Sequence, residues 1–408
     1  EFVIMDIFLT KRIPWGAWKR SKNKHVREAL EWVDDILFAL IAVYFINVFV
    51  FQNYQIPTAS LEKTLLVGDY LFVSKLSYGP RVPNTPISFP LVQNTLPFFN
   101  CKSYLDWPRW GYKRVKGFGK VQRNDIVVFN FPTGDTVALG QQNPDYYWLI
   151  YENGRDVVNT RKDVFGDIVY RPVDKRENYV KRCVGLPGQT LQIKNRIVYL
   201  DGKPNKEPDN VQYTYYVKLK GQLDSELLKD LGITNEDLTT LNQRGYMPLT
   251  ARAAKALRAR KDLVESVTLN TDATVGDLYP VNAVTGWTRD NYGPIWIPKK
   301  GATIALNMHN IAVYERPIKV YEGNDLEVKN GQIYINGKLA KSYTFKMDYY
   351  WMMGDNRDNS ADSRFWGFVP EDHIVGKPLM VWISLDKDYG LFDGKIRWNR
   401  FFKWVADI

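Results

Sequence analysis

The chain has 408 residues, of which 45% are hydrophobic and 14% aromatic, and its formal net charge is +10 at pH 7. This length can hold two or three folded units, and the composition is that of a globular chain. The positive charge suits nucleic acid or an anionic membrane surface, but the sequence has no zinc-finger spacing, no RNP motif and no long Lys/Arg block, which argues against nucleic acid.

A short basic segment, residues 1–35, precedes a hydrophobic run. No charged residue occurs from Ile36 to Leu61, and residues 36–51 are apolar apart from one asparagine. A membrane span needs about 20 residues, so we expect a transmembrane helix over residues 36–56. A buried core helix and a cleaved signal peptide are the alternatives, although no small-x-small cleavage site follows the run closely. The basic residues before the run predict a cytoplasmic N-terminus: Lys11, Arg12, Lys19, Arg20, Lys22, Lys24 and Arg27.

The residues after the run contain a serine between small neighbours, Thr58-Ala59-Ser60. Ser60 therefore stands where the chain would leave a membrane, but most loop serines are ordinary polar residues. A serine hydroxyl becomes a good nucleophile only when a base takes its proton. The chain has only three histidines, His25, His309 and His373, and no Gly-x-Ser-x-Gly partner for them, so a histidine base is not indicated.

The stretch from residue 57 to residue 208 predicts the first part of a β domain. Tyr70–Val73 and Asp125–Phe129 are strand-like and are bounded by turn residues. Residues 79–120 contain six prolines and predict a loop. Residues 133–175 are polar and aromatic without a helical period, so we expect no helix there.

A lysine lies in another strand-like stretch, Tyr179–Gly188. Alternate residues of a strand share a face, so Lys181 would point the same way as Tyr179 and Cys183, with no acidic neighbour on that face. Burial without a counter-charge lowers a lysine pKa from about 10.4, because desolvation disfavours the ammonium ion. Lys181 is therefore a candidate base, although a lysine that reaches solvent is the simpler interpretation. Cys183 and Cys101 are the only cysteines, and we expect two free thiols and no metal site.

Two similar segments, Leu191–Lys203 and Leu326–Lys338, each predict a hairpin with a Lys-Asn turn followed by Asp-Gly or Asn-Gly. Duplication and convergence explain them equally well. Residues 209–291 between them have a helical pattern, and we expect an inserted helical lobe that is dispensable for chemistry and contacts partners or substrate. Residues 292–408 return to β structure and end in a tail that mixes cations with aromatic residues, as membrane-interface segments do.

A third stretch, Gly354–Arg364, is dense in polar groups and follows the apolar Tyr350–Met353. Together with Ile56–Leu65 and Tyr179–Gly188, in this order after a membrane segment, it resembles the type I signal peptidases of bacteria. The third stretch matches that family's GDNRDNSxDSR signature throughout. Short strands and hairpins predict a mainly antiparallel β fold with one N-terminal membrane helix and a small helical insert, and the resemblance implies the same.

The resemblance implies a Ser–Lys dyad, in which Ser60 is the nucleophile and Lys181 its base. The Thr58 hydroxyl and the Ser60 N–H would donate to the oxyanion. The Ser360 hydroxyl would orient the lysine. Two ion pairs, Arg182 with Asp355 and Asp362 with Arg364, would support the site. Candidates for substrate binding, by their position in the family's scheme, are Leu61, Tyr70 and Phe72. No cofactor and no metal ion are implied.

One segment departs from the family pattern, because the usual Ser-Gly-Ser-Met-x-Pro is replaced by Thr58-Ala59-Ser60-Leu61-Glu62-Lys63. Threonine keeps the hydroxyl, alanine restricts the turn slightly, and leucine keeps an apolar side chain. Lysine in place of proline is expected to loosen the loop. These changes bear on rate and substrate range more than on the dyad.

The resemblance implies a membrane-anchored serine endopeptidase that removes N-terminal signal peptides from exported preproteins. Its expected location is the bacterial cytoplasmic membrane, with a single span, the catalytic domain on the periplasmic side, and contact with membrane phospholipid. A self-cleaving Ser–Lys repressor would need a DNA-binding head, and none is visible. A non-catalytic envelope protein on the same scaffold is the remaining alternative, and the retention of Ser60, Lys181 and Ser360 argues against it.

Overall fold

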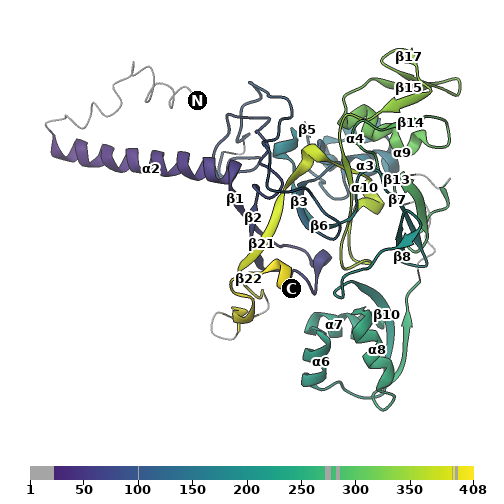
Figure 1. Ribbon diagram of the computed structural model, residues 1–408. Helices are drawn as coiled ribbons and strands as arrows, with labels where there is room; N and C mark the ends of the chain where they lie inside the picture. The colour runs from purple at the N-terminus through teal and green to yellow at the C-terminus, as the bar shows by residue number, and fades with distance from the viewer. Residues whose placement is uncertain (1–22, 100, 272–276, 282–284, 388, 391–393) are drawn as a thin grey trace.

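The protein is described here by a computed structural model that covers residues 23–99, 101–271, 277–281, 285–387, 389–390 and 394–408. A long helix, α2 (Lys24–Phe49), projects from a folded body that consists mainly of strands (Figure 1). The predicted class, mainly antiparallel β with one N-terminal apolar helix, is confirmed. Five of the basic residues used to predict orientation lie outside the described residues: Lys11, Arg12, Lys19, Arg20 and Lys22.

Helix α2 begins at an asparagine cap, where the Asn23 side chain accepts hydrogen bonds from the N–H groups of His25 and Val26. Its 26 residues give a length of about 39 Å, which exceeds the hydrocarbon thickness of a bilayer. None of its side chains is buried. Among the described residues, it is the one helix that is long and apolar enough to cross a membrane.

The prediction of where the membrane helix ends is wrong. We expected a helix over residues 36–56, but α2 ends at Phe49 and strand β1 (Phe51–Gln55) follows after one residue. β1 pairs antiparallel with β2 (Asp69–Ser74), and the Phe51 ring stacks on that of Phe72 with centroids 4.2 Å apart. Strand pairing and ring stacking are tertiary contacts, which override the apolar character that favoured a longer helix.

The main sheet is antiparallel and carries the predicted catalytic strand near its centre. β2 and β3 confirm the strands expected at residues 70–73 and 125–129. The order is β1-β2-β21-β3-β6-β19-β20, and β22 pairs with β21. The bounds of these strands are β3 (Ile126–Asn130), β6 (Asn178–Gly185), β19 (Tyr349–Met353), β20 (Val369–Pro370), β21 (Ile374–Ser384) and β22 (Lys403–Trp404).

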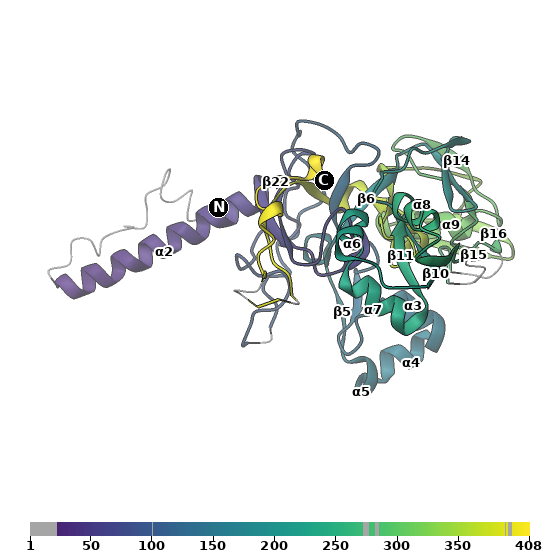
Figure 2. The ribbon, with the colours of Figure 1, turned by 90° about the horizontal axis from the view of Figure 1, so that it is seen from below.

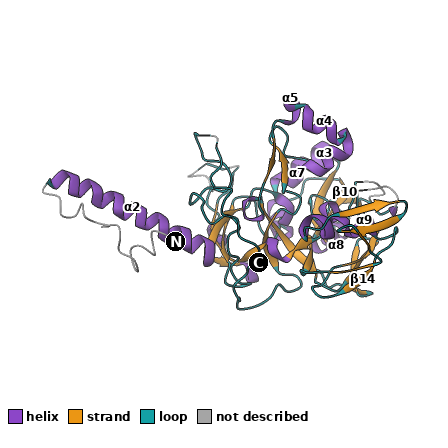
Figure 3. Ribbon diagram, turned by 90° about the horizontal axis from the view of Figure 1, so that it is seen from above, coloured by secondary structure: helices purple, strands orange, loops and turns teal. Residues whose placement is uncertain are grey.

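Smaller sheets cover the far side of the body from α2 (Figure 3). Both predicted hairpins form, and they lie in separate sheets ordered β13-β7-β8-β9 and β15-β16-β17. Strands β4 and β5 form one further pair, and β14 and β18 another. The bounds are β4 (Thr136–Ala138), β5 (Ile168–Tyr170), β7 (Thr190–Lys194), β8 (Ile197–Leu200), β9 (Lys203–Pro204), β13 (Tyr292–Trp296), β14 (Thr303–Ala305), β15 (Leu326–Lys329), β16 (Gln332–Ile335), β17 (Lys338–Leu339) and β18 (Ser342–Thr344).

Three short helices occupy residues 133–175, where we expected none. They are α3 (Tyr146–Asn153), α4 (Arg155–Thr160) and α5 (Lys162–Phe165). The Asp145 side chain caps α3 by accepting a 3.0 Å hydrogen bond from the Trp148 N–H. Each helix is too short for a clear apolar period, which is why the pattern did not predict them. Two other short helices are α9 (Ile311–Arg316) and α10 (Ser363–Trp366).

The insert, residues 209–291, is not purely helical. Helices α6 (Ser225–Leu231), α7 (Asn235–Arg244) and α8 (Ala251–Ala259) pack on a sheet ordered β11-β10-β12. These elements lie together, apart from α2 (Figure 2). They share a hydrophobic core of their own, in which Met247 and Leu257 are fully buried. The strand bounds are β10 (Gln212–Leu219), β11 (Tyr246–Thr250) and β12 (Val264–Leu269).

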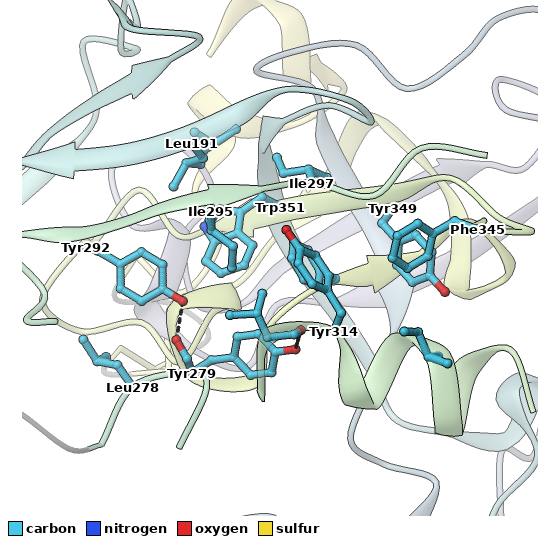
Figure 4. Packing of buried hydrophobic residues seen from close by; sticks show 14 of the residues in the cluster. Leu191, Leu278, Tyr279, Tyr292, Ile295, Ile297, Tyr314, Phe345, Tyr349 and Trp351 are labelled. Carbon is cyan, nitrogen blue, oxygen red and sulfur yellow. Dashed lines mark hydrogen bonds between the residues drawn. The ribbon is translucent and has the colours of Figure 1, made fainter. Parts of the chain in front are cut away.

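The largest core cluster lies between β19 and the smaller sheets, and it is rich in aromatic rings (Figure 4). Trp351 and Tyr292 are fully buried there, with ring centroids 5.6 Å apart. The Tyr292 hydroxyl donates to the carbonyl of Tyr279, so the polar atom of this buried ring is satisfied. This core fixes β19, which pairs with the strand that carries Lys181.

Candidate active site

Ser60 lies in a single turn of 3-10 helix, η3 (Ala59–Leu61), between β1 and β2. The apolar side chains of Leu61 and Leu65 anchor this turn in the core next to Val128, and Ser60 itself is 8% exposed. The backbone N–H of Ile56 donates to Asp69 O at 2.9 Å, which joins the start of the loop to β2. A buried turn thus holds the serine against the main sheet.

Lys181 lies in β6, which is flanked by β3 and β19. It is opposite Val127 of β3 in the antiparallel register. Its Nζ donates to Ser60 Oγ at 2.7 Å and to the carbonyl of Val180 at 3.1 Å. The structure therefore brings together two side chains that are 121 residues apart in the chain.

Burial sets the charge state of this lysine. Only 5% of Lys181 is exposed, and removal from water lowers the pKa of its amine to about 8. The carboxylates of Asp362 and then Asp355 raise this pKa, but their effect is smaller than that of burial. A large share of the amine is therefore neutral at mildly alkaline pH and has a lone pair that can accept a proton.

Thr58 lies two residues before the serine, at the start of the same turn. Its Oγ1 lies 3.5 Å from Ser60 Oγ, at the limit of a hydrogen bond. Thr58 has extended backbone angles, φ −131° and ψ 153°, and directly precedes η3. Its hydroxyl is thus close to any group that is bonded to Ser60 Oγ, as a donor to an oxyanion must be.

Arg182, the next residue after the lysine, points to a different set of partners. Its Nε and Nη2 donate to the two oxygens of Asp355 at 2.7 Å and 2.6 Å, and its Nη1 donates to Asn124 O at 2.7 Å. Asp355 also accepts a 2.7 Å hydrogen bond from Thr64 Oγ1. The expected Arg182–Asp355 contact is present, and it ties β6 to the loop after Ser60.

The segment Gly354–Arg364 folds over the serine turn. The N–H of Asn356 donates to Ser60 O at 3.1 Å, and its side-chain Nδ2 donates to Ala59 O at 3.3 Å. Asp362 and Arg364, both almost fully buried, form a bidentate pair at 2.9 Å and 2.8 Å. Asp362 also accepts from the N–H of Gly354, so the pair closes this segment on itself.

Ser360 does not make the expected contact with the lysine. Its Oγ is buried and has no hydrogen-bond partner within the described part of the chain. It lies against Gly354, where a Cβ would come within 2.3 Å of Ser360 Oγ and 2.6 Å of Ser60 O. Glycine is therefore required at position 354, because any side chain there would separate Ser360 from the Ser60 turn.

The histidines take no part in this arrangement. His309 is exposed, and His25 lies in the first turn of α2. His373 is buried, and burial lowers its pKa to about 4, so the ring is neutral at physiological pH. Its Nδ1 donates to Asp372 Oδ1 at 2.6 Å and its Nε2 accepts from Arg176 Nη1 at 2.7 Å.

The expectation that Lys63 loosens the loop is wrong. Lys63 Nζ donates to Asp237 Oδ2, in helix α7 of the insert, at 2.8 Å. The two side chains are only 10% and 5% exposed. The pair attaches the residues after Ser60 to the insert. No local sequence pattern indicated this contact, because the partners are 174 residues apart.

The three residues suggested for substrate binding are not grouped around one cavity. Leu61 is packed in the core, Tyr70 has an edge-on contact with Trp382, and Phe72 stacks on Phe51. None of them lines the two cavities found beside this region, of about 930 Å³ and about 640 Å³.

Aromatic residues that the sequence analysis did not select line the larger cavity. The rings of Tyr179 and Phe131 stack with centroids 4.4 Å apart, and Trp366 contacts both edge-on. The Tyr179 ring also lies 5.6 Å from Lys181 Nζ, so this cavity begins beside Lys181. The alternation of the strand, which places Tyr179 on the face of Lys181, was the available signal.

Comparison with known proteins points to one family. The family described as "Signal peptidase, peptidase S26" matches residues 29–246 and 339–383. Signal peptidase I of Haemophilus influenzae is 24% identical over 94% of this chain and 78% of the relative. For signal peptidase I of Helicobacter pylori (strain 26695), the identity is 23% over 92% of each chain. Signal peptidase I of Buchnera aphidicola from Acyrthosiphon pisum is 24% identical over 94% of this chain and 84% of the relative.

We expect Asp355→Ala to reduce the free energy of unfolding by about 3–5 kcal/mol, because it leaves the Arg182 guanidinium buried without its counter-charge. Denaturant unfolding in detergent measures the change. Asp106→Ala is the matched control, because its pairs with Lys102 and Arg109 are about half exposed and should contribute at most about 1 kcal/mol. Equal effects of the two variants would contradict the structural role of the Arg182–Asp355 pair.

Proposed function

Because the chain belongs to the signal peptidase family, peptidase S26, we propose that Ser60 and Lys181 are its catalytic dyad. The protein is a membrane-anchored serine endopeptidase that removes signal peptides from preproteins. The observation that carries the dyad assignment is the 2.7 Å contact between Lys181 Nζ and Ser60 Oγ. A non-catalytic role on the same scaffold would leave this contact and the depressed lysine pKa without a purpose.

In the proposed mechanism, the neutral Lys181 amine accepts the Ser60 hydroxyl proton as Oγ attacks the carbonyl carbon of the scissile peptide bond. The resulting ammonium ion can then donate its proton to the leaving amine. Water, activated by the same amine, hydrolyses the ester that remains on Ser60 and releases the signal peptide. Burial supports this cycle because it keeps the amine pKa close to the working pH.

We assign the Ser60 N–H and the Thr58 hydroxyl as the hydrogen-bond donors that stabilise the oxyanion. The support is the position of Thr58 Oγ1, 3.5 Å from the nucleophilic oxygen. The tetrahedral oxygen would form on a carbon bonded to Ser60 Oγ, within reach of both donors. Loss of one such donor typically lowers kcat by about 100- to 1000-fold.

The remaining assigned residues would hold the dyad rather than contact substrate. Arg182 with Asp355, and Asp362 with Arg364, neutralise one another within a buried region, so the amine of Lys181 has no salt-bridge partner in the described part of the chain. Ser360 supports the Ser60 turn by packing against Gly354. We assign Leu61 a role in packing rather than in substrate binding, because its side chain is buried and only 2% of the residue is exposed.

We further propose that α2 crosses the bacterial cytoplasmic membrane once, with the N-terminus inside and the catalytic domain outside. The basic residues before Ile36 and their absence from there to Leu61 support this orientation. Exposed aromatic residues near the C-terminus, Trp398, Phe402 and Trp404, would contact phospholipid at the interface.

Replacement of the dyad tests the mechanism directly. We expect Ser60→Ala, Lys181→Ala and Lys181→Arg each to lower kcat by about 10⁴-fold or more. The first removes the nucleophile, and at position 181 neither alanine nor a permanently protonated guanidinium can act as the base. Cleavage of a purified preprotein in detergent measures this. Lys194→Ala, which removes an exposed strand lysine, should keep full activity. Near-normal turnover by Lys181→Ala would refute the dyad.

The pH profile provides a second test. Lys181 must be neutral to accept a proton, and its pKa is lowered to about 8. We therefore expect kcat/KM to rise with pH, to be half-maximal near pH 8, and to be lost as the pH falls further and the amine is protonated. Initial rates on a preprotein between about pH 6 and pH 10 measure it. A rate that stays constant down to pH 6 is incompatible with this base.

Orientation can be tested separately in spheroplasts. Protease added outside should digest the region after Ser60, because we place all of it on the periplasmic side. A cytoplasmic protein in the same sample controls for lysis. Full protection of the catalytic domain in intact spheroplasts, with digestion after lysis, would contradict the proposed topology.

A further inference from the structure

We propose that the insert, residues 209–291, positions the nucleophile through the ion pair between Lys63 and Asp237. The proposal rests on the assignment of Ser60 as nucleophile, three residues before Lys63. It replaces our expectation that the insert is dispensable for chemistry. Lys63 and Asp237 are positioning residues here, since neither side chain contacts Ser60 Oγ or Lys181 Nζ in the structure.

The pair has the geometry of a specific contact. Lys63 Nζ lies 2.8 Å from Asp237 Oδ2, and the two side chains are 10% and 5% exposed. Ion pairs at exposed surfaces are screened and contribute little, whereas loss of one partner from a buried pair leaves an uncompensated charge. Separation of the insert from the Ser60 loop would therefore be costly.

The backbone conformation of Lys63 is one that the ion pair could stabilise. Lys63 has φ +70°, a conformation that residues other than glycine seldom adopt. Such a conformation persists only where surrounding contacts stabilise it. The proline expected at this position from the family pattern cannot adopt it, because its ring fixes φ near about −65°. The loop after Ser60 thus follows a course at Lys63 that a proline would not allow.

Asp237 is held rigidly at the other end of the contact. It is the third residue of α7, where its Oδ2 accepts a 2.9 Å hydrogen bond from the Thr234 N–H and its own N–H donates to Thr234 Oγ1 at 3.1 Å. This reciprocal capping box fixes the carboxylate relative to the helix. Leu241, one turn further along α7, is buried in the core of the insert.

The insert also holds the segment that covers Ser60. Gln212, at the start of β10, is fully buried; its N–H donates to Asp355 O at 2.9 Å and its carbonyl accepts from the Arg357 N–H at 3.0 Å. Between these two residues, the Asn356 N–H donates to Ser60 O. The serine turn is consequently attached to the insert in two ways. Lys63 contacts the insert directly, and Gln212 contacts the segment 355–357, which in turn contacts Ser60.

Two substitutions that keep size but remove charge test the proposal: Lys63→Met and Asp237→Asn. We expect each to lower kcat on a preprotein by about tenfold or more and to change KM by less than about twofold, because misplacement of the nucleophile affects the chemical step more than substrate binding. The double variant should lose no more than either single one, as expected for two residues that act as a unit. Active-site titration corrects for any inactive fraction.

Three controls separate positioning from general stability. Lys63→Arg keeps the pair and should retain most of the kcat. Val264→Ala removes buried methyl groups from the core of the insert and leaves the Lys63–Asp237 pair and its cap intact, so it should lower the melting temperature and leave kcat nearly unchanged. Asp230→Asn removes a carboxylate of the insert whose pair with Arg252 is about two-thirds exposed, and it should change neither.

The outcomes are distinguishable from failure of the dyad. If Ser60→Ala is inactive but Lys63→Met and Asp237→Asn retain normal kcat, the positioning role is wrong and the dyad stands. If Lys63→Met and Val264→Ala lose kcat in proportion to melting temperature, the contact is merely structural and the proposal is overturned. Retained activity in Ser60→Ala would overturn both assignments.

Discussion

Lys181 carries an amine into the centre of the main sheet, where removal from water lowers its pKa to about 8. The charged groups around Lys181 are paired with one another, so they do not cancel the effect of burial on the lysine pKa. The next residue, Arg182, is also buried, but its charge is matched by Asp355, and the charge of Asp362 is matched by Arg364. Ion pairs elsewhere in the site thus satisfy their own charges, and among the described residues none of these carboxylates forms a salt bridge with the lysine.

Local patterns in the sequence were enough for much of this. Strand alternation placed Lys181, the turn dipeptides placed both hairpins, and the polar signature at residues 354–364 marked the segment that covers the serine. Predictions failed where distant contacts decide. The end of α2 depends on pairing between β1 and β2, and the course of the loop after Ser60 depends on a carboxylate 174 residues away. A pattern within one segment does not show which other segment it contacts.

The hydroxyl of Ser360 illustrates a different limit. The family pattern assigned it to the lysine, whereas the structure has it packed against Gly354 with no hydrogen-bond partner among the described residues. A role in a motif is a statement about several states of an enzyme, and the free protein is only one of them. By contrast, the glycine beside it has a purely steric reason to be there, because a Cβ at position 354 would collide with atoms of Ser360 and Ser60.

Only Val50 separates the membrane helix from the first strand of the sheet, and Ser60 follows that strand after four residues. Such a connection has little freedom to bend. With Ser60 as the proposed nucleophile and α2 as the proposed membrane span, it would hold the Ser60 hydroxyl at a set height above the bilayer. Bilayer thickness and the depth of α2 would then contribute to the choice of cleavage site, because a preprotein would be cut where its own extended segment reaches that height. Changes in lipid chain length would then shift the cut along the substrate without any change in the protein.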